Sequence, residues 1–157
     1  MTLAAEYRQS QRSEEIARLR RVLALRAMGA VGMTQREIAQ ELGVSQSAVS
    51  QQLRSAPNLA LVHPESLIEA AGPVLAAVAA ARGYSRMGVF GSVARGEARH
   101  DSDIDLIVEP VSGASSFDFM KFKQVIEGVL GRKVDLISYG GLKPGTDEDI
   151  RQDLVLL

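Results

Sequence analysis

Two aspartates are the residues of this 157-residue chain whose spacing points most directly to chemistry. Asp103 and Asp105 flank Ile104 in an apolar run that continues to Val108. Because alternate residues of a strand share a face, roughly 6.5–7 Å apart, both carboxylates should point the same way. Two like charges so close are unfavourable unless a cation lies between them. Oxygen ligands of this kind suit Mg²⁺ or Mn²⁺, so the spacing predicts a metal site.

A Gly-Ser pair precedes these aspartates by ten residues. Val89 and Phe90 predict a strand that ends at Gly91 and leads into a helix. The free N–H groups at a helix start bind anions, and glycine lets a phosphate approach the backbone. The Ser92 hydroxyl and the Arg95 guanidinium would add donors suited to phosphate. Gly91, Ser92 and Arg95 are therefore the predicted nucleotide-binding residues.

A third acidic residue, Asp135, lies in a later apolar run over residues 133–138. A lone carboxylate there is costly without a partner. If this strand lies beside the first aspartate pair, three carboxylates could hold two divalent ions for nucleotidyl transfer, and Asp135 could accept the proton of an attacking hydroxyl. The alternative is a residue at the end of the strand that pairs with Lys133 or Arg132.

The N-terminal part carries the pattern of three helices. Apolar residues at one-face spacing predict a helix over Ser13–Met28, which Gly29 and Gly32 should end. Thr34 and Glu37 form a capping-box pattern at the start of a second helix.

The stretch Thr34–Arg54 has the spacing of a helix-turn-helix, with Gly43 ending one helix and Ser45 capping the next. The residues expected to fill the space between the helices are Ile38, Val44 and Val49. In such motifs the start of the last helix enters the major groove. Its polar residues would face bases, with glutamine suited to adenine, and neighbouring basic residues would contact phosphates.

The residues predicted to bind DNA are Arg36, Gln46, Ser47, Ser50, Gln51 and Arg54. The alternative is a three-helix bundle used only for protein contacts. The polar, uncharged surface of the last helix favours DNA. One module this small gives weak specificity, so we expect a homo-oligomer, with half-sites about 34–36 Å apart for a dimer.

Composition narrows the class of protein. The chain is 46% hydrophobic and 24% charged, and it has no cysteine. The lack of cysteine excludes disulfides and thiol-bound metals and fits a cytoplasmic protein. We find no apolar run of membrane-spanning length and no signal-peptide pattern, so we expect no membrane association. Residues 1–55 hold 8 basic and 5 acidic residues and residues 56–157 hold 10 and 14, which indicates two modules with different partners.

The remaining segments connect these modules. An ordered connector should span residues 56–64, followed by an apolar helix to Ala81 that is kinked or restarted at Pro73. We interpret His63 as a linker side chain and His100 as an exposed loop residue, because neither has a partner at metal spacing.

The C-terminal part should contain a helix from about Ser116 to Leu130 and a tail, Thr146–Leu157. The tail predicts a short helix plus a strand or packing segment. Its exposed apolar end is alternatively a surface for a partner.

The spaced set Gly91-Ser92, Asp103-x-Asp105 and a later Asp135 resembles the minimal nucleotidyltransferases of the DNA polymerase β superfamily. The neighbouring Phe90, Arg95-Gly96 and Ser102 match as well, and the resemblance covers roughly residues 65–157. Together with the helix-turn-helix pattern, it implies an α+β chain with three parts: a helical helix-turn-helix domain over residues 1–55, a connector over residues 56–64, and a small α/β domain with a short mixed sheet over residues 65–157.

The resemblance also implies an activity. Such proteins are typically antitoxins paired with a small helical HEPN-type ribonuclease toxin, and some transfer AMP from ATP to a tyrosine of that toxin. By analogy, Gly91 and Ser92 would hold the triphosphate and the three aspartates would bind Mg²⁺ or Mn²⁺. Arg95 would be a phosphate-binding or structural residue. The helix-turn-helix suits an antitoxin that represses its own operon.

Two other functions compete with this one. The chain could be a non-catalytic regulator that sequesters the toxin. It could also be a nucleotidyltransferase for a small molecule such as an aminoglycoside, which is less favoured because no acceptor domain is evident.

Overall fold

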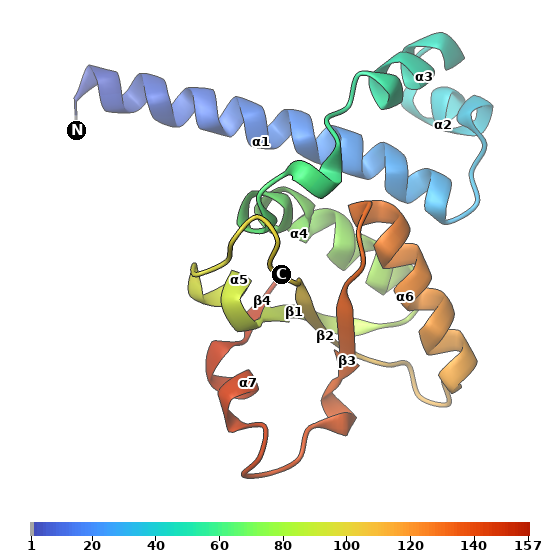
Figure 1. The fold of residues 1–157 in the computed structure, drawn as a ribbon. Helices are drawn as coiled ribbons and strands as arrows, with labels where there is room; N and C mark the ends of the chain where they lie inside the picture. The colour runs from blue at the N-terminus through green and yellow to red at the C-terminus, as the bar shows by residue number, and fades with distance from the viewer. Residues whose placement is uncertain (1) are drawn as a thin grey trace.

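The computed structural model describes residues 2–157 and has an α+β architecture, in which a helical N-terminal region is followed by a four-stranded mixed sheet (Figure 1). The strands are β1 (Ser85–Phe90), β2 (Asp105–Glu109), β3 (Asp135–Ser138) and β4 (Val155–Leu156). The α-helices are α1 (Leu3–Ala30), α2 (Gln35–Leu42), α3 (Gln46–Arg54), α4 (Pro64–Ala81), α5 (Gly91–Arg95), α6 (Ser116–Leu130) and α7 (Glu148–Asp153). Short 3₁₀ turns, η1 (Leu59–Leu61) and η2 (Tyr139–Gly141), complete the described elements.

The sheet has the strand order β3-β2-β1-β4. Strand β1 pairs antiparallel with both β2 and β4, whereas β2 and β3 run parallel, joined by the crossover helix α6. The predicted mixed sheet is confirmed. The expected tail of a helix and a strand is present as α7 and β4, and Val155 and Leu156 remain about half exposed.

The helix-turn-helix region forms through the local signals expected. The capping box of Thr34 and Glu37 is present, Gly43 ends α2 in the left-handed conformation, and the Ser45 side chain caps α3. A small core of Leu25, Ile38, Ala39 and Val49 holds these helices on the end of α1. One expectation is wrong: Val44 is 42% exposed rather than buried, because Val49 and Ala39 already fill the space between the helices.

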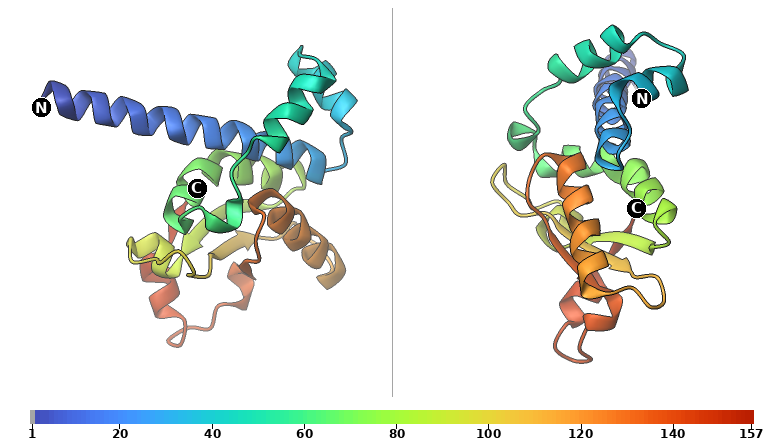
Figure 2. Two further views of the ribbon diagram at one scale, coloured as in Figure 1. Left: turned by 45° about the horizontal axis from the view of Figure 1, so that its top comes forward. Right: turned by 90° about the vertical axis from the view of Figure 1, so that its right-hand side faces the viewer.

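Helix α1 is longer than predicted. It begins at Leu3, where the Thr2 side chain caps it, and Gly29 is still helical. Figures 1 and 2 show that α1 crosses over the sheet domain, with α2 and α3 at its C-terminal end and its N-terminal half reaching beyond the body. The apolar spacing missed residues 3–12 because this part of the helix packs on almost nothing: Leu3 is 90% and Tyr7 72% exposed.

Helix α1 also packs into the main core. Leu23 and Ala27 are buried together with residues of α4 and α6, and Ile16 and Leu19 pack against them. Arg26 donates to the carbonyls of Gly128 (2.8 Å) and Val129 (3.0 Å), which are among the last carbonyls of α6 and have no intrahelical partner. Helix α1 therefore holds the helix-turn-helix region on one side and the sheet domain on the other.

Helix α4 continues through Pro73 without restarting. Proline has no N–H, so it leaves the carbonyl four residues earlier, that of Glu69, without its helical donor. Arg20 of α1 donates to this carbonyl at 3.1 Å and to that of Ala70 at 2.9 Å. A guanidinium from a neighbouring helix thus satisfies the carbonyl that Pro73 leaves unpaired.

The length and apolar composition of α4 alone would allow it to cross a membrane, contrary to our expectation that no segment would. In this structure 56% of that helix is buried. Leu67, Leu75 and Val78 lie in the core shared with α1, α6 and β1. Helix α4 is therefore accounted for as the central core helix of the fold.

Candidate active site

Asp105 and Asp135 meet at the start of two parallel strands. The β2–β3 register pairs them directly, with Leu106 opposite Leu136 and Ile107 opposite Ile137. Residues in register on neighbouring strands project from the same face of the sheet, which brings the two carboxylates together. The alternative for Asp135 is not seen: within residues 2–157 it forms no ion pair with Lys133 or Arg132.

Asp105 is the most perturbed of the acids. Its partial burial raises its pKa to about 6, and the nearby Asp135 carboxylate, followed by Asp103, contributes in the same direction. The Arg95 guanidinium opposes this effect only in part. A raised carboxyl pKa means that the ionised form is destabilised where it stands, which is the condition that a bound cation would relieve.

Asp103 lies two residues before β2, in a segment without regular secondary structure, rather than in the strand that was predicted for it. Its side chain is exposed, whereas Asp105 is half-buried. A cavity of about 250 Å³ lies beside it, lined by Asp103, Lys123, Glu127, Lys133, Val134 and Asp135. Sequence reasoning missed Lys123 and Glu127, because nothing in their local pattern shows that α6 runs past the aspartates. The sequence indicated Lys133 only as an ion-pair partner of Asp135.

Glu127 has a structural contact in this cavity. Its carboxylate accepts a hydrogen bond from the backbone N–H of Val134 at 3.1 Å, just before β3 begins. The contact fixes the entry into the strand that carries Asp135.

Gly91 is required by the site in two ways. Its φ of +72° lies in the left-handed region that side chains rarely adopt. A Cβ at this position would also collide with the carboxylate of Asp105. Glycine therefore allows the turn at the end of β1 to lie directly against the carboxylate of β2.

Ser92 and Arg95 lie on the short helix α5 that follows. Ser92 is half-buried beside Gly91. Arg95 donates to Asp153 of α7 at 2.6 Å and to Glu97 at 3.1 Å, so its guanidinium holds the C-terminal segment against α5. These contacts are structural, and phosphate binding by Gly91, Ser92 and Arg95 stays a prediction.

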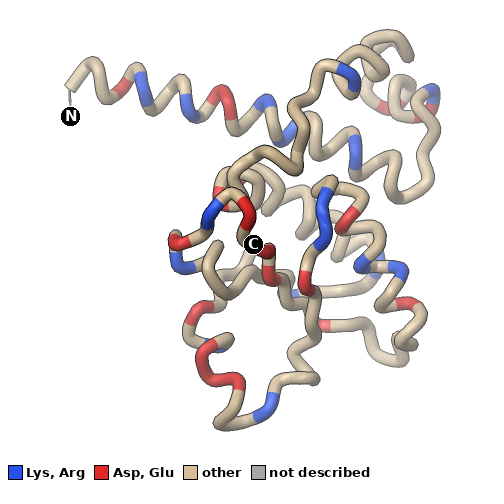
Figure 3. Tube along the Cα trace, viewed as in Figure 1, with Lys and Arg blue, Asp and Glu red and all other residues tan. Residues whose placement is uncertain are grey.

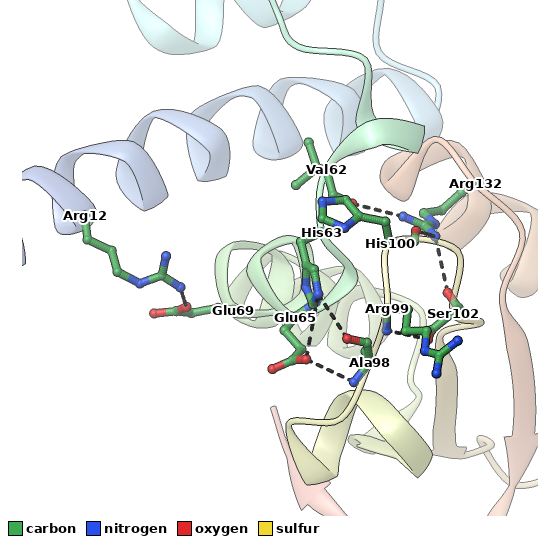
Figure 4. Close-up of polar contacts among 10 residues, drawn as sticks. All are labelled: Arg12, Val62, His63, Glu65, Glu69, Ala98, Arg99, His100, Ser102 and Arg132. Carbon is green, nitrogen blue, oxygen red and sulfur yellow. Dashed lines mark hydrogen bonds and ion pairs between the residues drawn. The ribbon is translucent and has the colours of Figure 1, made fainter.

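The loop over residues 96–104, which carries Asp103, is fastened to the start of α4 (Figure 4). Glu65 accepts the N–H of Ala98 at 3.1 Å. The His63 ring accepts the Glu65 N–H through Nδ1, so Nε2 carries the proton that bonds the Ala98 carbonyl at 3.1 Å. The ring also packs edge-on against exposed His100, 4.9 Å between centroids. His63 is thus a helix cap that positions a loop, a role that the linker interpretation missed.

The residues present fit a divalent cation by their chemistry. Asp103, Asp105 and Asp135 are oxygen donors, and burial together with their mutual repulsion raises the pKa of Asp105. In residues 2–157, no group of three or more histidine, cysteine or acidic side chains has the arrangement of a formed metal site. Metal binding by the three aspartates is therefore supported by their chemistry and register, and it remains a prediction in its geometry.

The predicted DNA-contacting residues lie on α2 and α3 of the helix-turn-helix region. Arg36, Gln46, Ser47, Gln51 and Arg54 are exposed, and Ser50 is half-buried. The tube in Figure 3 is uncharged along α3 except at Arg54, whereas acidic residues gather around the sheet domain. The polar surface of α3 is therefore free to meet another molecule, and DNA contact by these residues stays a prediction.

The chain is similar to known proteins in both of its parts. Residues 77–157 match the family described as "Nucleotidyltransferase domain", and residues 17–57 match the family described as "Sigma-70, region 4". A solved structure titled, provisionally, as a minimal nucleotidyltransferase is 40% identical, with a TM-score of 0.54 over 61% of this chain and 97% of that one.

Curated relatives extend the similarity. Protein adenylyltransferase MntA of Thermococcus cleftensis is 37% identical over 73 residues, which are 46% of this chain and 74% of that protein. A Methanocaldococcus jannaschii protein, provisionally named a protein adenylyltransferase, is 38% identical over 73 residues, 46% of this chain and 78% of that protein. With the aspartates in register on β2 and β3 and Gly91 against Asp105, these matches show that the chain belongs to the nucleotidyltransferase domain family and carries a helix-turn-helix-like region before it.

Proposed function

We propose that this protein transfers AMP from ATP to a hydroxyl group of a partner protein. The observation that carries the proposal is the pairing of Asp105 with Asp135, beside a left-handed turn at Gly91 where any side chain would be strained and would collide with Asp105. The name of the Thermococcus relative, a protein adenylyltransferase, supports AMP as the transferred group and a protein as the acceptor.

In the proposed reaction the acceptor oxygen attacks the α-phosphorus of ATP. The bond to the bridging oxygen of the β-phosphate breaks, and pyrophosphate leaves with its electron pair. Asp135, exposed at the edge of the sheet, accepts the proton of the attacking hydroxyl. Lys123 and Lys133 line the same cavity and place positive charge where phosphate charge would lie.

Asp103, Asp105 and Asp135 would hold Mg²⁺ or Mn²⁺ in this site. When bound, such an ion would neutralise negative charge on the triphosphate. The chain itself supplies the carboxylates, the turn at Gly91 against which the phosphates would lie, and Ser92 beside that turn.

We propose a HEPN-type toxin as the acceptor and the operon of the pair as the DNA target. The family resemblance supports the toxin. The exposed Gln46, Ser47 and Gln51 on α3 support sequence readout, and Arg36 and Arg54 support phosphate contacts. In this proposal the same protein silences its partner and represses its own transcription.

The test uses ATP labelled at the α-phosphate, Mg²⁺ and the product of the neighbouring gene. Wild type should label that product, and Asp103→Asn should reduce labelling by about hundredfold or more. Asp101→Asn is the matched control, because it removes the same charge from an exposed position on the same loop. Toxin neutralisation that survives Asp103→Asn with no label transferred would establish the sequestering regulator instead. Labelling of an aminoglycoside in place of the protein would establish the small-molecule enzyme.

A further inference from the structure

Arg132 joins three segments that are far apart in the sequence. It stands between Gly131, which ends α6, and the start of β3. Its Nη1 donates to the carbonyl of Val62 in the connector at 3.2 Å, and its Nη2 donates to the carbonyls of Ser102 at 3.3 Å and His100 at 3.4 Å. Figure 4 shows the guanidinium between the connector and the loop that leads into β2.

These contacts lie next to two of the acids of the site. Ser102 immediately precedes Asp103, and Asp135 follows Arg132 by three residues. The backbone N–H of Asp135 donates to the carbonyl of Ile104 at 2.9 Å, which extends the pairing of the two segments toward Arg132. The guanidinium therefore fixes the backbone on the N-terminal side of Asp103 to the segment that carries Asp135.

The other contacts of this loop do not replace it. Glu65 and His63 hold the loop at Ala98, on its far side from Asp103. Near Asp103, the Ser102 hydroxyl accepts the N–H of Arg99 at 2.6 Å, a bond within the loop itself. The His63 ring also packs edge-on against the His100 ring. Among residues 2–157, however, the side-chain hydrogen bonds that tie the backbone of positions 100 and 102 to another segment come from Arg132.

The contacts of the guanidinium also argue against a phosphate-binding role. Both of its terminal nitrogens already donate to carbonyl oxygens, and the residue is half-buried. A lysine could not replace it fully, because a single ammonium lacks the planar fork that reaches both the connector and the loop.

We propose that Arg132 is a positioning residue, which sets Asp103 relative to Asp105 and Asp135 so that the three carboxylates can bind a divalent ion together. Its effect on catalysis rests on the proposed function. Its effect on ion affinity does not, and the main measurement is therefore made without ATP.

The experiment measures Mn²⁺ affinity by electron paramagnetic resonance on the full chain. Arg132→Gln should bind Mn²⁺ at least about tenfold more weakly than wild type, and Arg132→Lys should fall between the two. Arg99→Gln is the matched control, because it removes one positive charge from the loop that Arg132 contacts, and the hydrogen bonds of Arg99 use only its backbone. Its Mn²⁺ affinity should stay within about twofold of wild type.

Two results would overturn the proposal: an Arg132→Gln affinity within twofold of wild type, or an equal loss in Arg99→Gln, which would make charge rather than geometry the cause. Circular dichroism checks that each variant is folded. If Arg132→Gln unfolds, two other measurements decide the question: the Mn²⁺ affinity of Arg132→Lys, and the recovery of Mn²⁺ affinity by Arg132→Ala when guanidinium ion is added. Wild-type affinity in Arg132→Lys together with no recovery in Arg132→Ala would count against positioning.

The rate of AMP transfer provides an independent measurement. Labelling by Arg132→Gln should recover toward the wild-type rate as Mg²⁺ is raised to saturation, whereas a general loss of structure would lower the rate at every concentration. If wild type binds Mn²⁺ but transfers no label, the proposed function fails, and the Mn²⁺ affinities still decide the role of Arg132.

Discussion

Asp105 and Asp135 are direct partners across the parallel strands β2 and β3, although the 15-residue helix α6 separates these strands in the sequence. Their pairing places like charges together in a half-buried position, and the raised pKa of Asp105 records the cost. Because the ionised carboxylates repel each other in this position, a bound cation would stabilise them, and removing one of them should stabilise the metal-free protein.

Asp105→Asn should stabilise the metal-free protein at alkaline pH. The folded-state pKa of Asp105, about 6, lies above the ordinary value of 3.8. The carboxyl group therefore contributes fully to the free energy of unfolding below pH 4, and this contribution is lost as the pH rises through 6. At pH 8 the substitution should add about 1 kcal/mol, discounted for the solvent exposure of the carboxyl, or roughly 2–4 °C in Tm. Thermal unfolding in EDTA at pH 8 and pH 4.5 measures the gain, which should shrink at the lower pH.

Asp101→Asn is the control for this comparison, and its Tm should match wild type at both pH values. Added Mg²⁺ should raise the Tm of wild type more than that of Asp105→Asn. Equal stability of Asp105→Asn and wild type at pH 8 would contradict the account of the paired acids.

Gly91→Ala should destabilise the fold and abolish AMP transfer. The left-handed φ costs about 1–2 kcal/mol with a side chain, and the collision with Asp105 displaces a carboxylate of the site. Urea unfolding measures the loss. Gly29→Ala is a control of opposite sign, because this helical glycine has open space around its Cβ position and alanine should add about 0.5–1 kcal/mol. Wild-type stability and labelling in Gly91→Ala would contradict the requirement for glycine at this turn.

Arg20→Met should cost about 1–2 kcal/mol of unfolding free energy, because the carbonyl of Glu69 loses the donor that compensates for Pro73. Pro73→Ala restores the missing N–H, so Arg20→Met should cost less in that background. A double-mutant cycle in urea measures this coupling. Arg21→Met, at an exposed position on the same helix, should change stability by less than about 0.5 kcal/mol. Additive effects of Arg20→Met and Pro73→Ala would disprove the compensation.

DNA binding should separate base readout from phosphate contact. Gln46→Ala should cost about 1–3 kcal/mol on the preferred operator and relax its specificity, whereas Arg54→Gln should weaken all sequences alike and reduce the salt slope by about one. Fluorescence anisotropy on the upstream DNA over a range of salt concentrations measures both. Gln9→Ala, exposed on the far half of α1, is the control. No binding of wild type at low salt would leave the three-helix region a protein-contact module.

Much of the chain could be predicted because its signals are local. A capping box, a left-handed glycine and an apolar stripe act within a few residues, and they placed α2, α3 and α6 correctly. Residues 3–12 were missed because a helix that packs on little leaves no apolar periodicity to detect. Val44 was misplaced because its burial depended on how closely α2 and α3 approach each other.

The sequence by itself determined which residues of this protein can carry chemistry: the glycine turn, the three aspartates and the polar residues of α3. Only the tertiary structure decided how these parts are held, with Asp105 opposite Asp135, Arg95 on Asp153, and the guanidiniums of Arg20, Arg26 and Arg132 on backbone carbonyls. The physical reason is that a backbone carbonyl looks the same at every position of a sequence. Which carbonyls lack a donor, and which arginine reaches them, is fixed only when α1, α4, α6 and the loop before β2 pack together.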